Sequence, residues 1–142
     1  MSASFDFQWT PDEFQNEAIS AGFVGLARTA MDGVALGKVF APEETGRLKR
    51  SVRTAPPDYE EDDTEAATEE DLAATSVEDV LGQIARDSSG GAILFGSWID
   101  YAYYVEAGTE LMPKQPYVLP AGDVLIGGER FALHVAEEWS RE

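Results

Sequence analysis

The sequence predicts an α+β fold: a long N-terminal helix, a small and mainly antiparallel sheet, and a C-terminal helix, with an acidic loop insertion. Three observations support this prediction. Apolar residues recur at helical spacing near both ends of the chain, short apolar runs separated by turn residues lie between them, and one acidic stretch interrupts the order. With 142 residues, 44% of them hydrophobic, the chain can form one core, so we expect a single domain over residues 1–142.

The first helix is predicted over residues 10–40. Thr10 is a suitable N-cap, and Pro11 suits the first helical position. The apolar stripe that follows consists of Ile19, Phe23, Leu26, Ala30 and Val34. Beside it runs a row of small residues: Ala18, Gly22, Gly25 and Gly33. Since glycine costs a helix roughly 1 kcal/mol relative to alanine, either another backbone approaches closely here, from within the fold or from a second subunit, or the helix is weak.

Residues 45–56 are predicted to form a basic turn and the first strand, and residues 57–76 an acidic mobile insertion. The turn holds four of the ten basic residues of the chain: Arg47, Lys49, Arg50 and Arg53. Positions 56 to 80 then hold eleven acidic residues and no basic one. Such blocks of like charge are typical of solvated loops.

A β-hairpin is predicted over residues 77–100, because the apolar runs VLGQIAR and AILFGSW flank the turn residues DSSGG. Alternatively, Ser76 caps a short helix that extends to Arg86.

A Tyr- and Pro-rich loop is predicted over residues 101–121, with one helical turn from position 102 to position 107 that Gly108 and Thr109 end. The second helix is predicted over residues 122–140. Its apolar stripe consists of Val124, Gly128, Phe131, Val135 and Trp139.

The charge of the chain is strongly negative, with 27 acidic and 10 basic residues and a net charge of −17. Such a surface repels nucleic acid backbones and anionic lipid. Only three of the basic residues are lysines, and acid-rich, lysine-poor surfaces suit high salt, which screens the repulsion. A halophilic host is therefore a hypothesis. The N-terminus lacks the pattern of a secretory signal.

The residues needed for catalysis or metal binding do not form a recognisable pattern. The chain has no cysteine and one histidine, His134, which we interpret as a satisfied or solvent-edge residue of a helix. There is no GxSxG elbow, no phosphate-binding loop and no EF-hand spacing. We therefore expect no enzymatic activity, no catalytic residues, no metal and no cofactor.

The stretch YAYYVEAGTELMPKQPYVLP, residues 101–120, is unusually rich in tyrosine. Tyrosine is enriched at protein interfaces, so the tyrosines are candidate interface residues, whereas Tyr101 and Tyr104 could instead fill the core. Glu106 lies between apolar residues and, if buried, needs a partner. The amides of Gly108 and Thr109, or the side chains of Arg47 and Arg50, are candidates, and a solvent-facing position without a role is the alternative.

Two motifs of this chain resemble those of a known family. TGRLKRS, residues 45–51, precedes a hairpin and the later run that contains Gly96-Ser97, residues 101–109 and residues 112–121. This order is similar to that of the tail-completion or neck (head–tail connector) proteins of long-tailed bacteriophages, the HK97-type tail component family. The resemblance spans roughly residues 10–140, and the acidic insertion departs from it.

The resemblance implies a structural virion protein, assembled in the host cytoplasm and located at the junction between neck and tail. Copies would form a homo-oligomeric ring of six between the capsid portal complex and the tail tube, in contact with a neighbouring connector or stopper ring. DNA would pass through the lumen without specific binding, and no membrane is involved. The residues expected to define the fold or the assembly interface are Arg47, Arg50, Tyr101, Tyr104, Glu106, Gly108, Thr109, Pro113, Pro116 and Tyr117.

Two alternatives remain open. The chain could form the tail terminator or the stopper ring of the same particle. It could instead be an acidic DNA mimic that inhibits a nucleic-acid enzyme, which would require charges spaced regularly over an ordered face.

Overall fold

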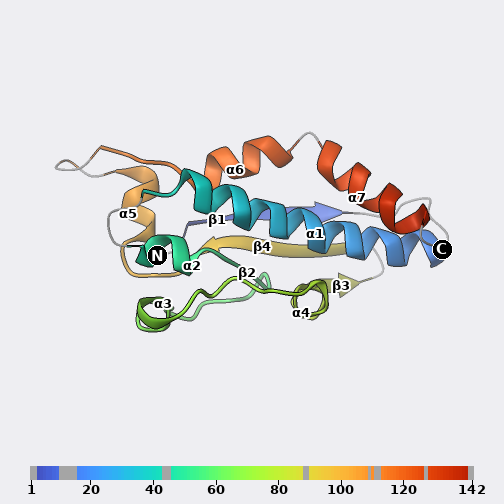
Figure 1. The fold of residues 1–142 in the computed structure, drawn as a ribbon, viewed down its shortest axis with the longest axis horizontal. Helices are drawn as coiled ribbons and strands as arrows, with labels where there is room; N and C mark the ends of the chain where they lie inside the picture. Colours follow the sequence, from blue (N-terminus) through green and yellow to red (C-terminus); the bar gives the residue numbers. More distant parts are fainter. Residues whose placement is uncertain are drawn as a thin grey trace.

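The computed structural model describes residues 3–9, 16–42, 46–87, 90–108, 110, 113–126 and 128–140. Its elements, in chain order, are β1 (Ala3–Trp9), α1 (Asn16–Phe40), α2 (Arg47–Ser51), β2 (Arg53–Ala55), α3 (Ala66–Glu69), α4 (Val77–Leu81), β3 (Ala85–Asp87), β4 (Gly90–Ser97), α5 (Ala102–Ala107), α6 (Val118–Leu125) and α7 (Glu129–Ser140). The long helix α1 lies along the sheet, with α6 and α7 beside it (Figure 1). The α+β fold class is confirmed.

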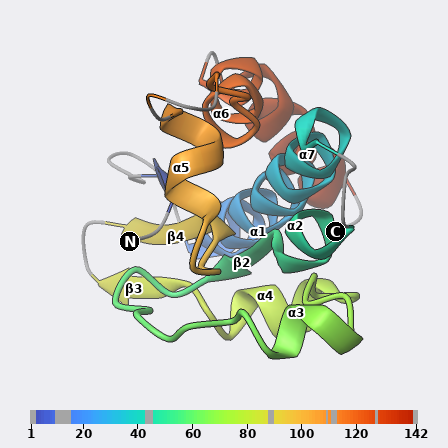
Figure 2. The same ribbon diagram turned by 90° about the vertical axis from the view of Figure 1, so that its left-hand side faces the viewer.

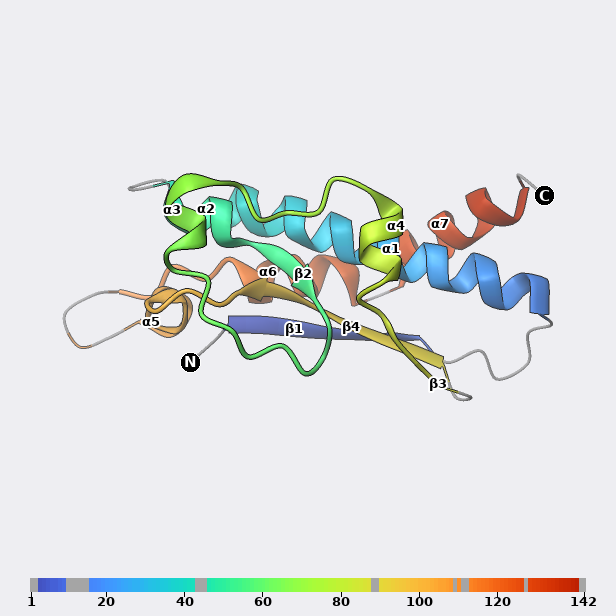
Figure 3. The same ribbon diagram turned by 90° about the horizontal axis from the view of Figure 1, so that it is seen from below.

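Strand β4 is the centre of the sheet. It pairs antiparallel with β1 on one side and with β2 and β3 along the other, so Phe5 and Thr54 are both register partners of Phe95. The predicted hairpin is present as β3 and β4. Figure 3 shows α1, α2, α3 and α4 along one face of the sheet.

The core forms where α1 packs on β4. Leu26, Ala30 and Phe95 have no exposed surface. A Cβ atom added at Gly33 would lie 2.6 Å from the Phe95 ring, so the glycine lets the helix approach the strand. Gly33, one of the small residues in the row along α1, thus serves close packing within the fold.

Helix α7 packs against the other part of this row. A Cβ atom at Gly25 would lie 2.5 Å from Cγ2 of Val135, and Phe131 also lies close to this position. The interpretation of the glycines as a sign of a weak helix is therefore wrong at Gly25 and Gly33, where an element of the same chain fills the space.

The N-terminal part of the chain differs from the prediction. Strand β1 precedes α1 and was not expected, while Thr10 and Pro11 lie outside the described residues. Residues 45–56 were expected to form a basic turn and a strand, but residues 47–51 form α2, and only Arg53–Ala55 is extended.

The acidic segment, residues 57–76, is attached to the rest of the molecule. It contains α3, it buries Asp63 and Ala67, and the amide of Leu72 donates to the carbonyl of Arg50 at 2.8 Å. The expectation of a wholly solvated loop is therefore wrong, and its mobility stays a prediction. Figure 2 shows α3 and α4 together on one side of the sheet.

Two boundaries of the later elements also differ. Ser76 caps α4 by accepting from the amide of Asp79, as the alternative prediction had it. The helix ends at Leu81, however, and Arg86 lies in β3, so both the predicted helix and the first hairpin strand are shorter than expected. The C-terminal helix is divided into α6 and α7 around Gly128, whose φ of 75° a helix does not allow. Within the described ranges, none of the helices is both long and apolar enough to cross a bilayer.

Candidate assembly surface

The carboxylate of Glu106 joins α5 to α6. Its Oε2 atom accepts from the amides of Tyr117 at 2.7 Å and Val118 at 3.1 Å, and its Oε1 atom accepts from the amide of Leu119 at 2.8 Å. The first amides of a helix lack partners within the helix and attract negative charge. Glu106 therefore acts as the cap of α6.

This arrangement corrects the expected partners of Glu106. The amide of Gly108 donates to the carbonyl of Tyr104 at 2.7 Å, and Thr109 lies outside the described residues. The arginines of α2 are not the partners of Glu106 either. Arg50 donates from Nε to the carbonyl of Ala67 at 2.8 Å and so connects α2 to α3. Arg47 has an interaction of its own.

Residues 113–117, which precede α6, lie against the C-terminal end of α5. Gly108 has a φ of 78°, and a Cβ atom there would lie 2.8 Å from the backbone nitrogen of Lys114. The amide of Gln115 donates to the carbonyl of Val105 at 2.8 Å. Pro113 and Pro116 are exposed and restrict the backbone of this segment.

The tyrosines divide between the core and the surface. Tyr117 is fully buried, and burial raises the pKa of its hydroxyl well above the ordinary value. Tyr101 is half-buried against the core. Tyr103 and Tyr104 are 42% and 41% exposed, and their rings meet edge to face at 5.8 Å. The core interpretation therefore fails for Tyr104, which faces outward.

The exposed side of α5 and α6 carries several large apolar residues together with the carboxylate of Asp123. We call it the α5–α6 surface, and its large exposed residues are Tyr103, Tyr104, Leu119, Val124 and Ile126. The two helices lie next to each other (Figure 2), and Glu106 connects them through Leu119. Exposed apolar residues gathered on adjacent elements are typical of surfaces that bind another protein.

A second cluster fixes the acidic segment to β2 and was not anticipated from the sequence. Arg53 lies over the ring of Tyr59, with the guanidinium carbon 4.9 Å from the centroid, and its Nη1 lies 3.6 Å from Oδ2 of Asp63. The Tyr59 hydroxyl donates to Oδ1 of Asp63 at 2.6 Å. Burial and this hydrogen bond raise the pKa of Tyr59 to about 12. The one sequence feature that could have indicated this cluster is a tyrosine inside an acidic block.

His134 attaches α7 to α1. Its Nε2 atom lies 2.6 Å from Oδ2 of Asp32, and Arg130 lies 3.7 Å from the same oxygen. His134 thus lies in a helix as expected and has a partner at Nε2, but its Nδ1 atom is buried without a hydrogen bond, 3.9 Å from the carboxylate of Glu137. Over the described part of the chain, no group of three His, Asp or Glu side chains is arranged to hold a metal ion.

Comparison with known proteins identifies no relative. No family model, no curated protein and no solved structure matches this chain.

Proposed function

We propose that this protein is a structural component of the neck of a tailed virus. Copies of it form a ring of six that joins the capsid portal complex to the tail tube and lets DNA pass. The observation that supports this proposal best is the α5–α6 surface, because three of its five residues, Tyr103, Tyr104 and Leu119, lie in the segments that resemble the head–tail connector family.

The contacts of Glu106, Gly108 and Tyr117 show what each of these motif residues contributes to the structure around α5 and α6. Glu106 fixes the start of α6, Gly108 supplies a positive φ, and Tyr117 fills the core. These contacts fix the start of α6 to α5 and leave Tyr104 exposed. A surface held in one shape before binding loses less conformational entropy when another subunit docks on it.

The charge of the molecule is compatible with a conduit for DNA. With a net charge of −17, a lumen lined by this chain repels the passing polyanion and prevents it from sticking. A ring also requires a heterologous interface, in which one face of a subunit binds a different face of the next.

The test is Tyr104→Asp in the virus. Because Tyr104 is exposed, the variant should fold, as circular dichroism of the purified protein would show, and yet yield no infectious tailed particles. Val39→Asp, at an exposed position near the end of α1, serves as the matched control. Normal numbers of infectious particles from the Tyr104 variant would contradict the role of this surface.

The position of this protein in the virus particle would distinguish the proposed neck ring from a tail terminator and from a stopper ring. A reconstruction of the virion would place the chain above, within or below the stopper layer. A position away from any head-to-tail joint would refute the whole proposal.

The acidic DNA mimic is the second candidate, because the acidic segment is anchored through Tyr59 and Asp63 and so presents its carboxylates on a defined framework. A mimic should inhibit a nuclease or polymerase in solution. Glu69→Lys with Glu70→Lys should relieve that inhibition, since both residues are exposed. Such inhibition would favour this candidate over the ring.

A further inference from the structure

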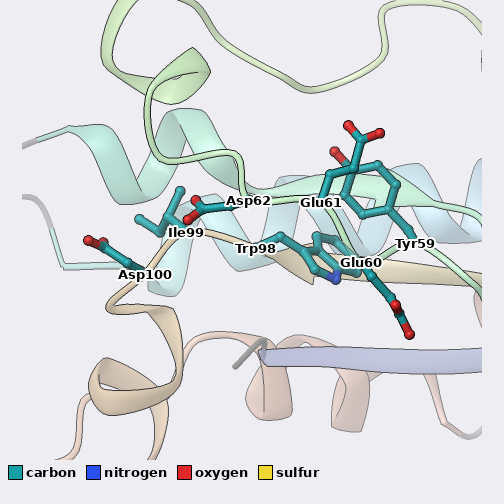
Figure 4. A pocket seen from close by; sticks show the side chains of 7 residues that line it. All are labelled: Tyr59, Glu60, Glu61, Asp62, Trp98, Ile99 and Asp100. Atoms are coloured by element: carbon teal, nitrogen blue, oxygen red, sulfur yellow. The ribbon is translucent and has the colours of Figure 1, made fainter.

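A surface pocket of about 270 Å³ lies where the acidic segment passes the end of β4 (Figure 4). The residues on which the inference depends are Tyr59, Glu60, Glu61, Asp62, Trp98 and Asp100. In the view of Figure 4, the Trp98 ring lies between Asp62 and Asp100 on one side and Tyr59 on the other. The pocket thus combines aromatic rings with carboxylates.

Two aromatic rings form one wall of this open pocket, and the carboxylates around it are exposed. The rings of Tyr59 and Trp98 meet edge to face at 5.2 Å, and Trp98 is only 6% exposed. Aromatic rings attract cations through their quadrupole, as Arg53 over one side of the Tyr59 ring illustrates, and carboxylates form charge-assisted hydrogen bonds with cations. The matching ligand is the ammonium or guanidinium group of a side chain whose methylene stem lies against the rings.

The two segments that form the pocket are fixed to each other. The amide of Asp63 donates to the carbonyl of Trp98 at 3.0 Å, and the amide of Asp100 donates to the hydroxyl of Thr64 at 2.9 Å. Thr64 also donates to the carboxylate of Asp62, which lowers the pKa of Asp62 and keeps it charged. The pocket is therefore formed before anything binds.

One basic side chain is available to fill it. Among the basic residues that the structure describes, Lys114 is the one without an ion pair, hydrogen bond or ring contact within the chain. It is exposed, and the amide of the next residue, Gln115, donates to the carbonyl of Val105 at 2.8 Å, which restrains the backbone of this loop. In a chain with 27 acidic and 10 basic residues, an unpaired lysine on a restrained loop is a natural complement to this pocket.

We propose that the pocket receives the Lys114 side chain of a second copy of this chain. The inference rests on the proposed ring, for which it supplies one heterologous contact: the loop before α6 of one subunit enters the pocket of the next. The contact uses two different surfaces of the molecule, so repetition around an axis can close it into a ring.

Charge exchange between the two surfaces tests the inference. Lys114→Glu alone, and Glu60→Lys with Glu61→Lys alone, should each raise the concentration needed for assembly by at least about tenfold, measured by analytical ultracentrifugation. An equal mixture of the two variants should assemble again, because every loop then meets a pocket of opposite charge in an alternating ring. Glu69→Lys with Glu70→Lys is the matched control, with the same change in charge outside the pocket.

A peptide experiment tests ligand binding by the pocket independently of ring assembly. Acetylated Pro-Lys-Gln-Pro, which reproduces residues 113–116, should shift the indole N–H resonance of Trp98, whereas the same peptide with glutamate for lysine should not. If the wild type assembles and both charge variants assemble equally well, the pocket inference is overturned and the ring stands. If the wild type stays monomeric but the peptide binds, the pocket stands and the ring loses its support. If the wild type stays monomeric and does not bind the peptide, both the pocket inference and the ring are overturned.

Discussion

At the scale of single residues, Glu106 marks the limit of what the sequence could predict. Its apolar neighbours indicated burial and the need for a partner. The partners are amides of residues 117–119, eleven to thirteen positions further along the chain. Local spacing cannot reveal them, because they come within reach only after the loop folds back on α5.

Glu106→Ala is expected to lower the free energy of unfolding by about 2 kcal/mol, since it removes a charged cap from α6 and leaves its first amides without their acceptor. Glu106→Gln should lie between the wild type and the alanine variant, because an amide oxygen still accepts but its NH₂ group faces donors. Urea unfolding followed by circular dichroism measures both. Glu110→Ala, an exposed glutamate of the same segment, is the control and should change little. Equal losses at both positions would remove the capping role.

Tyr59 is a second residue whose contacts could not be predicted from the sequence. In the sequence it is one aromatic residue inside an acidic block, and nothing near it in the chain indicates that Arg53 lies over its ring. The tertiary contact turned an apparent loop into an attached segment. Reading the block by its charge alone therefore missed the hydrogen bond to Asp63.

At the scale of elements, long periodic segments were predicted well and short ones poorly. Helix α1 followed from its apolar stripe, and the capped helix α4 followed from Ser76. Strand β1 was missed although Phe5 and Phe7 alternate with polar residues, the pattern of a half-buried strand. Helix α2 was missed because only five residues form it, too few for periodicity to show.

The contact between α1 and α7 gives the prediction at this scale. Gly25→Ala should gain helix propensity but destabilise the protein by about 1–3 kcal/mol, because the new methyl group overlaps Val135. Val135→Ala makes room, so the double variant should lose less stability than the two single losses added together. Thermal unfolding of the four proteins of this cycle provides the measurement. Additive losses would show that the two residues do not touch.

At the scale of the whole molecule, the distribution of charge is the dominant physical fact. Much of the net charge of −17 lies in a segment that is held against the sheet, so folding brings these carboxylates closer together than they are in the unfolded chain. Salt weakens the repulsion between them, since the screening length falls from about 10 Å at 0.1 M to about 3 Å at 1 M.

The free energy of unfolding in urea should therefore rise steadily as KCl is increased to about 2 M. Replacing Glu60, Glu61, Glu69 and Glu70 by glutamine should flatten this dependence, because fewer charges remain to be screened. Full stability of the unaltered protein at low salt would argue against a halophilic host.

The sheet cannot form until strand β4 has been synthesised. In the described sheet every other strand pairs with β4 alone, and Phe5, near the start of the chain, has its register partner in Phe95. During synthesis β1 and α1 thus leave the ribosome long before any sheet exists to cover them. Contacts so distant in sequence form slowly, so a nascent chain interrupted ahead of residue 90 holds strands without a partner and is a substrate for chaperones and proteases rather than for assembly.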